Sequence, residues 1–371
     1  MLKNNNLSST RSSSRKNRMV SMHSITALIT CAGGVISPSH IQSLRSNPEN
    51  RQIKIIGTDM HVPCIGQCLS DKFYQVPPGD SPNYLEKMID ICSKESVDVL
   101  FPASHEEAIV LSKNRELFKK NGTVVAISKY NVLEKAFNKK QAYQTLMNNN
   151  LPCPDFRVVS SLKEFEAASN SLGIGEKKIV MKPILSRGGR GTRILTTEKL
   201  ANHLLNDKPG YLEANYSEIL NMLSTLDENN FPELILMEYL PGTIFSVDFL
   251  AKNGKALMIV PKVRVCGSAS QTIVGRVKRD PLLEDTIGKI CRVFGFDYTI
   301  NIELGCNDAG VPLPFDFNPR VAASVAFCAA AGANILYYAL KLALNEEVPE
   351  VTVKDNVLMM RYFKEQYLNL E

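Results

Sequence analysis

Two acidic side chains near the C-terminus are spaced so that a hairpin would bring them together. Residues 299–305 and 311–320 form two β-rich runs joined by Cys306-Asn-Asp-Ala-Gly310, and Asn, Asp and Gly tolerate hairpin-turn conformations. A turn centred between the last two of these residues places Glu303 directly opposite Asp316. Cross-strand neighbours lie about 4.5–5.5 Å apart at Cβ, where like charges repel. The pair therefore predicts a cation between the two carboxylates.

Two further residues on the second strand suit the same chemistry. Asn318 follows Asp316 by two positions, so both side chains point to one face of the strand. Two carboxylates and an amide are hard oxygen ligands, which suit Mg²⁺ or Mn²⁺ shared with the phosphates of a nucleotide. Arg320 adds a planar donor fork for a phosphate or a carboxylate. The alternative is a surface hairpin with solvated acids.

A glycine-rich stretch, Lys182-Pro-Ile-Leu-Ser-Arg-Gly-Gly-Arg-Gly-Thr-Arg193, forms a second candidate phosphate site. A β-rich run delivers Lys182 into a loop that contains three glycines and three arginines. Glycines let backbone N–H groups approach phosphate oxygens, and the adjoining cations neutralise them. No Gly-Lys-Ser/Thr precedes a helix, so the stretch is not a Walker A loop. A basic hairpin turn is the alternative.

A third stretch could hold a flat ring. Glu233-Leu-Ile-Leu-Met-Glu-Tyr-Leu-Pro-Gly242 is an apolar strand that runs into a turn, with Glu238 embedded in it. The next strand, 244–250, alternates with period two and carries Ser246 and Asp248 on one face. An adenine ring needs an apolar slot with a few backbone and carboxylate hydrogen bonds, which this strand and turn could supply.

The N-terminal third alternates strands and helices. Expected strands cover 25–30, 52–57, 97–101 and 123–127, with helices over 40–46, 90–94 and 106–120. Such alternation predicts a small doubly wound parallel sheet. Cys31-Ala-Gly-Gly34 lacks the full Gly-x-Gly-x-x-Gly spacing of a dinucleotide site, although Asp59 lies at a suitable distance for a ribose. A tight strand-to-helix turn is favoured over NAD binding.

Helix is expected over residues 129–150, where Pro152 and Pro154 end it. Strand 156–159, helix 161–171 and strand 178–183 follow. The apolar run 321–340 contains Ser, Gly and Asn and reads as a buried Ala-rich helix rather than a membrane span.

The composition argues against a nucleic-acid-binding protein and against a disulfide-bonded one. The net charge is +5, but the first 23 residues hold five cations and no acid, so the rest of the chain is neutral and no nucleic-acid-binding face is indicated. The nine cysteines include no Cys-x-x-Cys pair, which indicates reduced thiols in a cytoplasmic protein. Residues 1–24 are expected to be disordered; a transit peptide and a mis-assigned start, at Met19 or Met22, both stay open.

Taken in order, these signals resemble the ATP-grasp superfamily. The chain is most similar to its single-unit members related to carbamoyl-phosphate synthase and biotin carboxylase, over about residues 25–345. The resemblance rests on the Lys-then-Gly-rich loop, on the Met-Glu-Tyr-Leu-Pro-Gly turn, and on Glu303 followed by Asp316-Phe-Asn-Pro-Arg320. It implies an α/β (α+β grasp) fold in which a small parallel α/β pre-ATP-grasp domain precedes a two-lobed ATP-grasp domain.

The implied boundaries are a basic tail (1–24), a Rossmann-like pre-ATP-grasp domain (25–128) and the ATP-grasp domain (129–371). The last would comprise a helical linker (129–155), an ATP-lid lobe (156–239) and a metal-binding catalytic lobe (240–371).

The resemblance also implies roles for single residues. It implies metal ligation by Glu303, Asp316 and Asn318, and catalytic phosphate or acyl-phosphate contacts by Arg320 and Lys182. The implied nucleotide-binding residues are Lys139, Lys182, Ser186, Gly188, Gly189, Gly191, Glu238, Leu240 and Asp248. The family's ribose-binding acid is replaced by Ile244, and its usual second metal-binding glutamate is replaced by Asp316.

The activity implied is an ATP- and Mg²⁺-dependent (or Mn²⁺-dependent), ADP-forming ligase that joins a carboxylate to an amine through an acyl-phosphate. The substrates expected are small molecules, without nucleic acid or membrane; a homodimer stays open. Lys262, Arg264 and Arg276 are candidate carboxylate clamps. The alternatives are a carbamoyl- or carboxy-phosphate-forming enzyme, a non-catalytic ATP-binding protein and a nicotinamide oxidoreductase.

Overall fold

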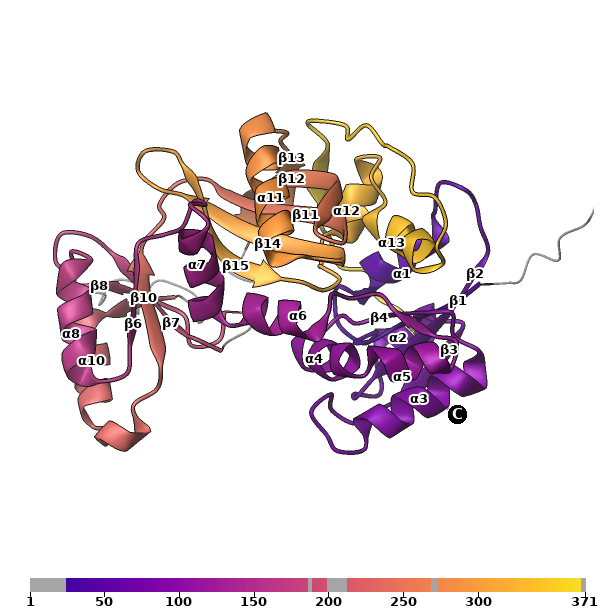
Figure 1. Ribbon diagram of the computed structural model, residues 1–371, viewed down its shortest axis with the longest axis horizontal. Coiled ribbons are helices and arrows are strands. Elements are labelled where there is room, and N and C mark those ends of the chain that lie inside the picture. The colour runs from indigo at the N-terminus through magenta and orange to yellow at the C-terminus, as the bar shows by residue number, and fades with distance from the viewer. Residues whose placement is uncertain (1–24, 186–188, 199–211, 268–271, 368–371) are drawn as a thin grey trace, which may run out of the picture.

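The computed structural model describes residues 25–185, 189–198, 212–267 and 272–367. Within these ranges the chain forms three β-sheets that follow one another along the sequence (Figure 1). The first and second sheets have five strands each, and the third has six.

The first sheet is parallel throughout, with strand order β3-β2-β1-β4-β5. Its strands are β1 (Ile25–Ile29), β2 (Ile53–Asp59), β3 (Lys72–Gln75), β4 (Val99–Phe101) and β5 (Val124–Val125). Its helices are α1 (Ser37–Arg45), α2 (Ile65–Leu69), α3 (Tyr84–Glu95), α4 (His105–Lys113) and α5 (Arg115–Lys120). All five residues of β1 are buried, as expected for a strand covered on both faces. The predicted doubly wound sheet is confirmed.

Local details of this region differ from the expectations. Residues 60–76 hold α2 and β3, which the sequence did not suggest because their short runs mix polar and apolar residues. The single helix expected over 106–120 is two helices, α4 and α5, that meet at Asn114.

Two helices connect the first sheet to the second. The helix expected over 129–150 is interrupted at Asn138, between α6 (Tyr130–Phe137) and α7 (Lys139–Asn148). The Asn138 side chain accepts a hydrogen bond from the backbone N–H of Gln141, so it caps α7. This interruption puts Lys139 at the first position of α7, where its backbone N–H donates to the carbonyl of Ile184, 3.3 Å away.

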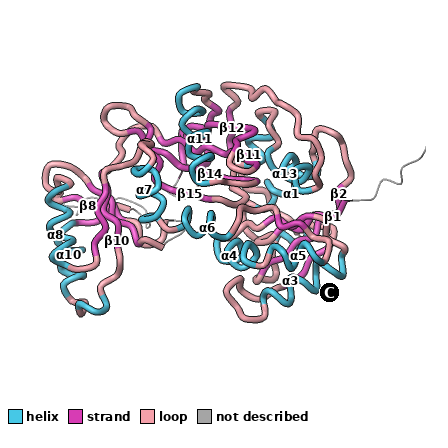
Figure 2. Tube along the Cα trace, viewed as in Figure 1, coloured by secondary structure: helices cyan, strands magenta, loops and turns pink. Residues whose placement is uncertain are grey.

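The second sheet has strand order β6-β10-β7-β8-β9. Its strands are β6 (Phe156–Val159), β7 (Ile179–Pro183), β8 (Arg193–Thr196), β9 (Glu213–Asn215) and β10 (Leu234–Glu238). The helices among its described residues are α8 (Leu162–Ser171), α10 (Tyr216–Ser224) and the short 3₁₀ helix η1 (Glu228–Asn230). α8 and α10 lie on its outer side, at one end of the molecule (Figure 2).

The third sheet has strand order β15-β14-β11-β12-β13-β16 and is antiparallel throughout. Its strands are β11 (Ile244–Lys252), β12 (Lys255–Gly267), β13 (Thr272–Val277), β14 (Tyr298–Cys306), β15 (Pro312–Asn318) and β16 (Leu358–Met360). Three helices belong to this part: α11 (Pro281–Phe294), α12 (Val325–Ala330) and α13 (Ile335–Ala343).

The apolar run after Arg320 is buried, as expected, but it forms two short helices rather than one. α12 and α13 pack against α1, so the first and third sheets share one hydrophobic core. Ion pairs and hydrogen bonds join the same two parts, including Arg51–Glu346 and Asn334 to the carbonyl of Ser43. No helix in the described ranges is long and apolar enough to cross a membrane.

Candidate active site

The hairpin β14–β15 pairs Glu303 with Asp316, as the sequence predicts. The two strands do not keep one register from the turn to this pair, however, because a bulge lies between them. Near the turn the partners are Cys306 and Pro312, and this register alone would set Glu303 against Phe315. A bulge after Glu303 inserts one extra residue on β15 and shifts the pairing to Asp316. Because Phe315 is the extra residue, it has no partner on β14. Its backbone carbonyl instead accepts hydrogen bonds from two side chains.

Those two side chains come from different elements, α7 and β7. The hydroxyl of Tyr143 on α7 donates to the carbonyl of Phe315 at 2.9 Å, and Nζ of Lys182 donates to the same oxygen at 3.2 Å. Lys182 Nζ also lies 4.7 Å from the centroid of the Phe315 ring. The bulge therefore connects the β14–β15 hairpin to β7, the strand that carries Lys182.

A continuous chain of polar contacts runs along β15. Lys139 Nζ lies 3.7 Å from Oδ1 of Asp316, and Asn318 Nδ2 donates to Oδ2 of the same carboxylate at 3.0 Å. Arg320 Nη2 donates in turn to Oδ1 of Asn318 at 3.1 Å. Asp316 and Asn318 of β15 and Arg320 just after it thus lie together, beside the predicted Lys139.

Glu303 is held from the other side by Arg264 of β12. Arg264 Nη2 lies 2.8 Å from Oε1 of Glu303, and Arg264 Nε donates to the hydroxyl of Thr272. Burial raises the pKa of Glu303 to about 7; Asp316 adds to the rise, and the Arg264 cation opposes it. Glu303 therefore lies in a poorly solvated position where a further cation would favour its charged form.

Lys182 is a buried cation whose partners are a carbonyl and an aromatic ring. Only 6% of Lys182 is exposed, and no carboxylate of the described residues lies within ion-pair distance of its Nζ. Burial lowers its pKa to about 8, the neighbouring Lys139 lowers it further, and Asp316 opposes the change. Two lysines close together in a buried position favour an anionic ligand between them and the hairpin.

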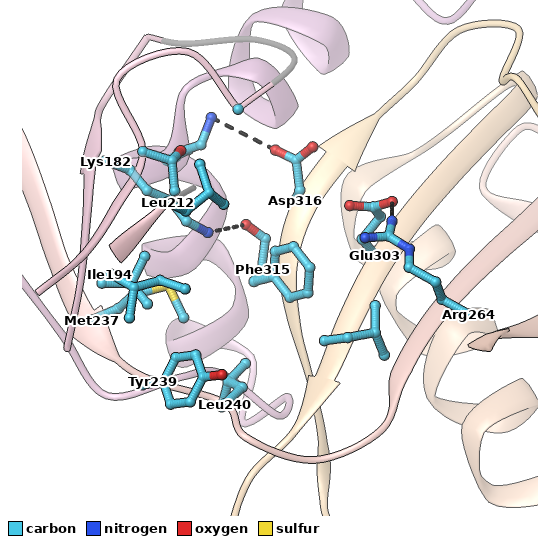
Figure 3. Close-up of a pocket in the computed structure, with 15 residues that line it drawn as sticks. Lys182, Ile194, Leu212, Met237, Tyr239, Leu240, Arg264, Glu303, Phe315 and Asp316 are labelled. Atoms are coloured by element: carbon cyan, nitrogen blue, oxygen red, sulfur yellow. Dashed lines mark hydrogen bonds and ion pairs between the residues drawn. The ribbon is translucent and has the colours of Figure 1, made fainter. Parts of the chain in front are cut away.

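These groups open onto a cavity of about 280 Å³ between the second sheet and the hairpin (Figure 3). Lys139, Lys182, Arg264, Glu303 and Asp316 lie at its polar end. The rest of the wall is mainly apolar and comes from Val180, Ile194, Leu212, Met237, Tyr239, Leu240, Ile244 and Phe315. An apolar slot that ends in cations and carboxylates matches the two ends of a nucleotide, its base and its phosphates.

Only some of the other predicted nucleotide-binding residues line this cavity. Leu240 and Gly189 line the cavity. Glu238 does not line it, because its carboxylate turns away to accept the backbone N–H of Asp155 at 2.8 Å. A side chain at Gly191 would collide with Pro183, so this glycine permits close packing of the loop. Ser186 and Gly188 lie outside the described residues.

Asp248 also lies away from the cavity lining. It is buried on β11, where Lys262 Nζ pairs with its Oδ2 at 2.5 Å and Ser324 Oγ donates to the same oxygen at 2.7 Å. Asn301 Nδ2 donates to its other oxygen at 2.6 Å. Asp248 therefore pairs with Lys262 of the neighbouring strand β12, and neither residue lines the cavity. Lys262, which was predicted to clamp a carboxylate of the substrate, instead pairs with a carboxylate of the protein.

The sequence missed most of the slot's apolar wall. Val180, Ile194 and Met237 each lie in a short apolar strand, and nothing in their spacing separates a slot residue from a core residue. Arg264 was singled out only as a carboxylate clamp, and its pairing with Glu303 depends on the order of strands in the third sheet, which the sequence does not give.

Arg320 faces a second cavity of about 340 Å³ between the first and third sheets. Asp316, Asn318 and Lys139 also line it, so the two cavities meet at the end of β15. The residues after Arg320 are held by the first sheet's domain: His40 Nε2 lies 3.0 Å from the carbonyl of Ala322. That nitrogen must carry the proton, since a carbonyl only accepts. Burial lowers the pKa of His40 to about 4, so the ring is neutral near pH 7.

Three protein-family models match the chain. Residues 28–126 match the PylC-like N-terminal domain, and residues 136–279 match an ATP-grasp domain. Residues 230–366 match a family described as ATP-grasp in the biosynthetic pathway with Ter operon. The two ATP-grasp models together span more than half of the 371 residues. The chain belongs to the ATP-grasp superfamily, with a PylC-like domain at its N-terminus.

Solved structures support the same fold. The biotin carboxylase domain dimer of Hydrogenobacter thermophilus 2-oxoglutarate carboxylase, in complex with MgADP, ADP and bicarbonate, is 14% identical, with a TM-score of 0.67 over 91% of this chain and 74% of that one. Staphylococcus aureus N5-carboxyaminoimidazole synthetase is 14% identical, with a TM-score of 0.66 over 91% and 82%. Campylobacter jejuni biotin carboxylase is 12% identical, with a TM-score of 0.65 over 88% and 73%. No curated protein matches by sequence.

Proposed function

We propose that the protein is an ADP-forming ATP-grasp ligase that joins a carboxylate to an amine through an acyl-phosphate. The observation that carries this proposal is the polar end of the 280 Å³ cavity, where two buried lysines face the two acids of the hairpin. The ATP-grasp domain and the structural similarity to ligases solved with ADP or MgADP support it.

The residues present fit a divalent cation. Glu303 and Asp316 are cross-strand neighbours, and Asn318 adds an amide oxygen on the same face. No group of three or more His, Cys, Asp or Glu side chains in the described ranges is arranged to hold a metal ion. The candidate donors at the hairpin are therefore two carboxylates and an amide. Such a set suits Mg²⁺, which commonly takes its other ligands from water and phosphate oxygens. When bound there, the metal would neutralise charge on the β- and γ-phosphates.

Side chains of the protein bind the base, the phosphates and the substrate carboxylate. The apolar slot orients the base, and Lys139 and Lys182 meet the phosphates. Arg320 holds the substrate carboxylate in the second cavity, next to the end of β15. One carboxylate oxygen attacks the γ-phosphorus and the bond to ADP breaks, which gives an acyl-phosphate. An amine then attacks the acyl carbon, loses a proton and releases phosphate. Positioning and charge neutralisation supply the catalysis.

The position of Arg320 is expected to depend on His40. His40→Leu removes the donor to the buried carbonyl of Ala322, which costs about 1–3 kcal/mol of local stability. We expect kcat to fall about tenfold, while the KM for ATP changes little, because Arg320 does not line the nucleotide slot. Steady-state kinetics measure both. His40→Gln keeps a donor and should recover most of kcat; equal kcat values for both variants and the wild type would contradict this role.

The proposal is tested by ADP release from MgATP across pooled small carboxylates, amino acids and amines. We expect release that requires both a carboxylate and an amine. Release with bicarbonate alone would favour a carboxy-phosphate-forming enzyme. Tight ATP binding without release in any pool would favour a non-catalytic nucleotide-binding protein.

We also propose a cytoplasmic location and a homodimeric assembly. All nine cysteines are free thiols in the structure, as expected in a reducing compartment. One of the similar structures is a dimer of biotin carboxylase domains, which supports the assembly. Sedimentation equilibrium would measure the oligomeric state.

A further inference from the structure

A third cavity, of about 400 Å³, opens at the carboxyl edge of the parallel sheet. It is lined by the loops that follow β1, β2, β3 and the start of α4 after β4. The strand order reverses between β1 and β4, because β2 and β3 lie on one side of β1 and β4 and β5 on the other. In open α/β sheets, ligands bind at such a switch point, outside the carboxyl ends of the strands.

This third cavity adjoins the second one. Met60, Ser104 and Glu106 line both, so the two cavities lie side by side. The second cavity also contains Asp316, Asn318 and Arg320. A substrate whose carboxylate meets Arg320 can therefore extend its other end into the switch-point cavity.

The two adjoining cavities differ in charge. The described lining of the second cavity contains three cations, Lys139, Arg190 and Arg320, and two acids, Glu106 and Asp316. Among the described residues, the lining of the switch-point cavity has four acids, no lysine or arginine, and a single histidine: Asp59, Asp80, Glu106, Glu107 and His61. A molecule that lies across both cavities meets positive charge at one end and negative charge at the other.

The glycine turn after β1 does not offer a phosphate site in this cavity. The backbone N–H of Gly33 donates to Oδ2 of Asp59 at 2.8 Å, and the N–H of His61 donates to Oδ1 at 2.9 Å. Asp59 thus takes the N–H groups that a phosphate would need. Glu107 is fixed by the hydroxyls of Thr30 and Ser104. A dinucleotide would bring its pyrophosphate against these carboxylates, whereas a cation would be attracted.

We propose that the switch-point cavity binds an ammonium group carried by the carboxylate substrate, at the end of the molecule remote from the carboxylate. Asp80 and Glu106 are the accessible acids that contact this group, while the buried Asp59 and Glu107 contribute negative potential. The inference rests on the proposed function, because it takes the carboxylate at Arg320 as the reacting group. It makes the substrate an ω-amino carboxylate or a larger compound that contains one.

A length series tests the proposal. ADP release is measured with ω-amino carboxylates of three to six carbons, with the unsubstituted fatty acids of the same length and with the matching dicarboxylates. Hydroxylamine serves as the amine and traps any acyl-phosphate as a hydroxamate. At one or more chain lengths, kcat/KM for the amino compound should exceed that for the fatty acid about tenfold or more, as expected for a charge-assisted contact. Equal rates, or faster turnover of dicarboxylates, would overturn the proposal.

A binding measurement separates this inference from the proposed function. Calorimetric titration of the MgADP-loaded protein with the same compounds should show the same preference for ammonium-bearing carboxylates, even if no turnover occurs. Absence of ADP release with every carboxylate would count against the ligase alone; absence of a binding preference would count against the ammonium site alone.

Substitutions test whether Asp80 and Glu106 cause the preference for ammonium-bearing carboxylates. Asp80→Asn together with Glu106→Gln should reduce it at least fivefold, while the KM for ATP stays unchanged. Asp90→Asn, which removes an exposed acid on α3 away from the three cavities, is the matched control and should keep the preference. A double variant with the full preference would show that these acids do not bind the ammonium group.

Discussion

Replacing Asp316 by asparagine is expected to reduce the rate of ADP formation by about 10²–10³-fold, the usual cost of losing one group that stabilises transition-state charge. Asparagine has nearly the same shape, so the hairpin should persist. The change removes a negative charge that faces Glu303 across the hairpin and Lys139 across the slot. Weaker metal binding and a misplaced γ-phosphate are the physical reasons. Initial rates at saturating ATP and increasing Mg²⁺ measure the effect.

Asp308→Asn is the matched control for this variant. Asp308 lies in the exposed turn of the same hairpin, away from the cavity lining. It should keep the wild-type rate and the wild-type dependence on Mg²⁺. If Asp316→Asn also retained both, Asp316 would not be a metal ligand.

Lys182→Met is expected to have the second-largest effect. Methionine fills a similar volume without the cation, so phosphate contact is lost while the wall of the slot is kept. Lys182 Nζ is buried beside the carbonyl of Phe315 and lacks a carboxylate partner among the described residues. We expect kcat/KM for ATP to fall about 10²-fold, with much of the loss in ATP affinity.

A buried cation that has no carboxylate partner among the described residues is unfavourable, so its removal should also change stability. Without nucleotide, Lys182→Met should unfold at the same temperature as the wild type or at a higher one. MgATP should then stabilise the variant less than it stabilises the wild type. Lys177→Met, an exposed lysine just before β7, is the control for both measurements. Wild-type kinetics in Lys182→Met would remove Lys182 from the phosphate site.

The hairpin illustrates how far the sequence determines the site. Residue types and the expected position of the turn predicted that Glu303 and Asp316 face one another, and the structure confirms the pair. The register comes from a bulge at Phe315 that the sequence did not indicate, because a bulge depends on what lies on the other side of the strand. Here Tyr143 and Lys182 satisfy the carbonyl that the bulge releases.

Other parts of the site depend on tertiary contacts that have no local sequence signal. Glu238 turns toward Asp155, and Asp248 is engaged by Lys262, although strand alternation alone left both available to a nucleotide. The Arg264–Glu303 pair requires β11 to lie between β12 and β14, so that a residue from β12 reaches over it. His40 lies 282 positions before its partner Ala322.

The sequence predicted the types of the secondary-structure elements better than it predicted where they end. Strand–helix alternation gave the parallel sheet because buried strands and amphipathic helices have different periods. The interruptions at Asn114 and Asn138, and the break between α12 and α13, were missed because each residue pattern also fits a continuous helix. The interruption at Asn138 matters for the site, since it puts Lys139 at the start of a helix that faces β15.

The central claim is that a carboxylate is phosphorylated by ATP before an amine displaces phosphate. Turnover with a carboxylate labelled with ¹⁸O in both oxygens tests it most directly, by mass spectrometry of the released phosphate. An acyl-phosphate pathway predicts ADP as the nucleotide product and one ¹⁸O atom in each phosphate. Unlabelled phosphate, or AMP with pyrophosphate in place of ADP, would contradict the account.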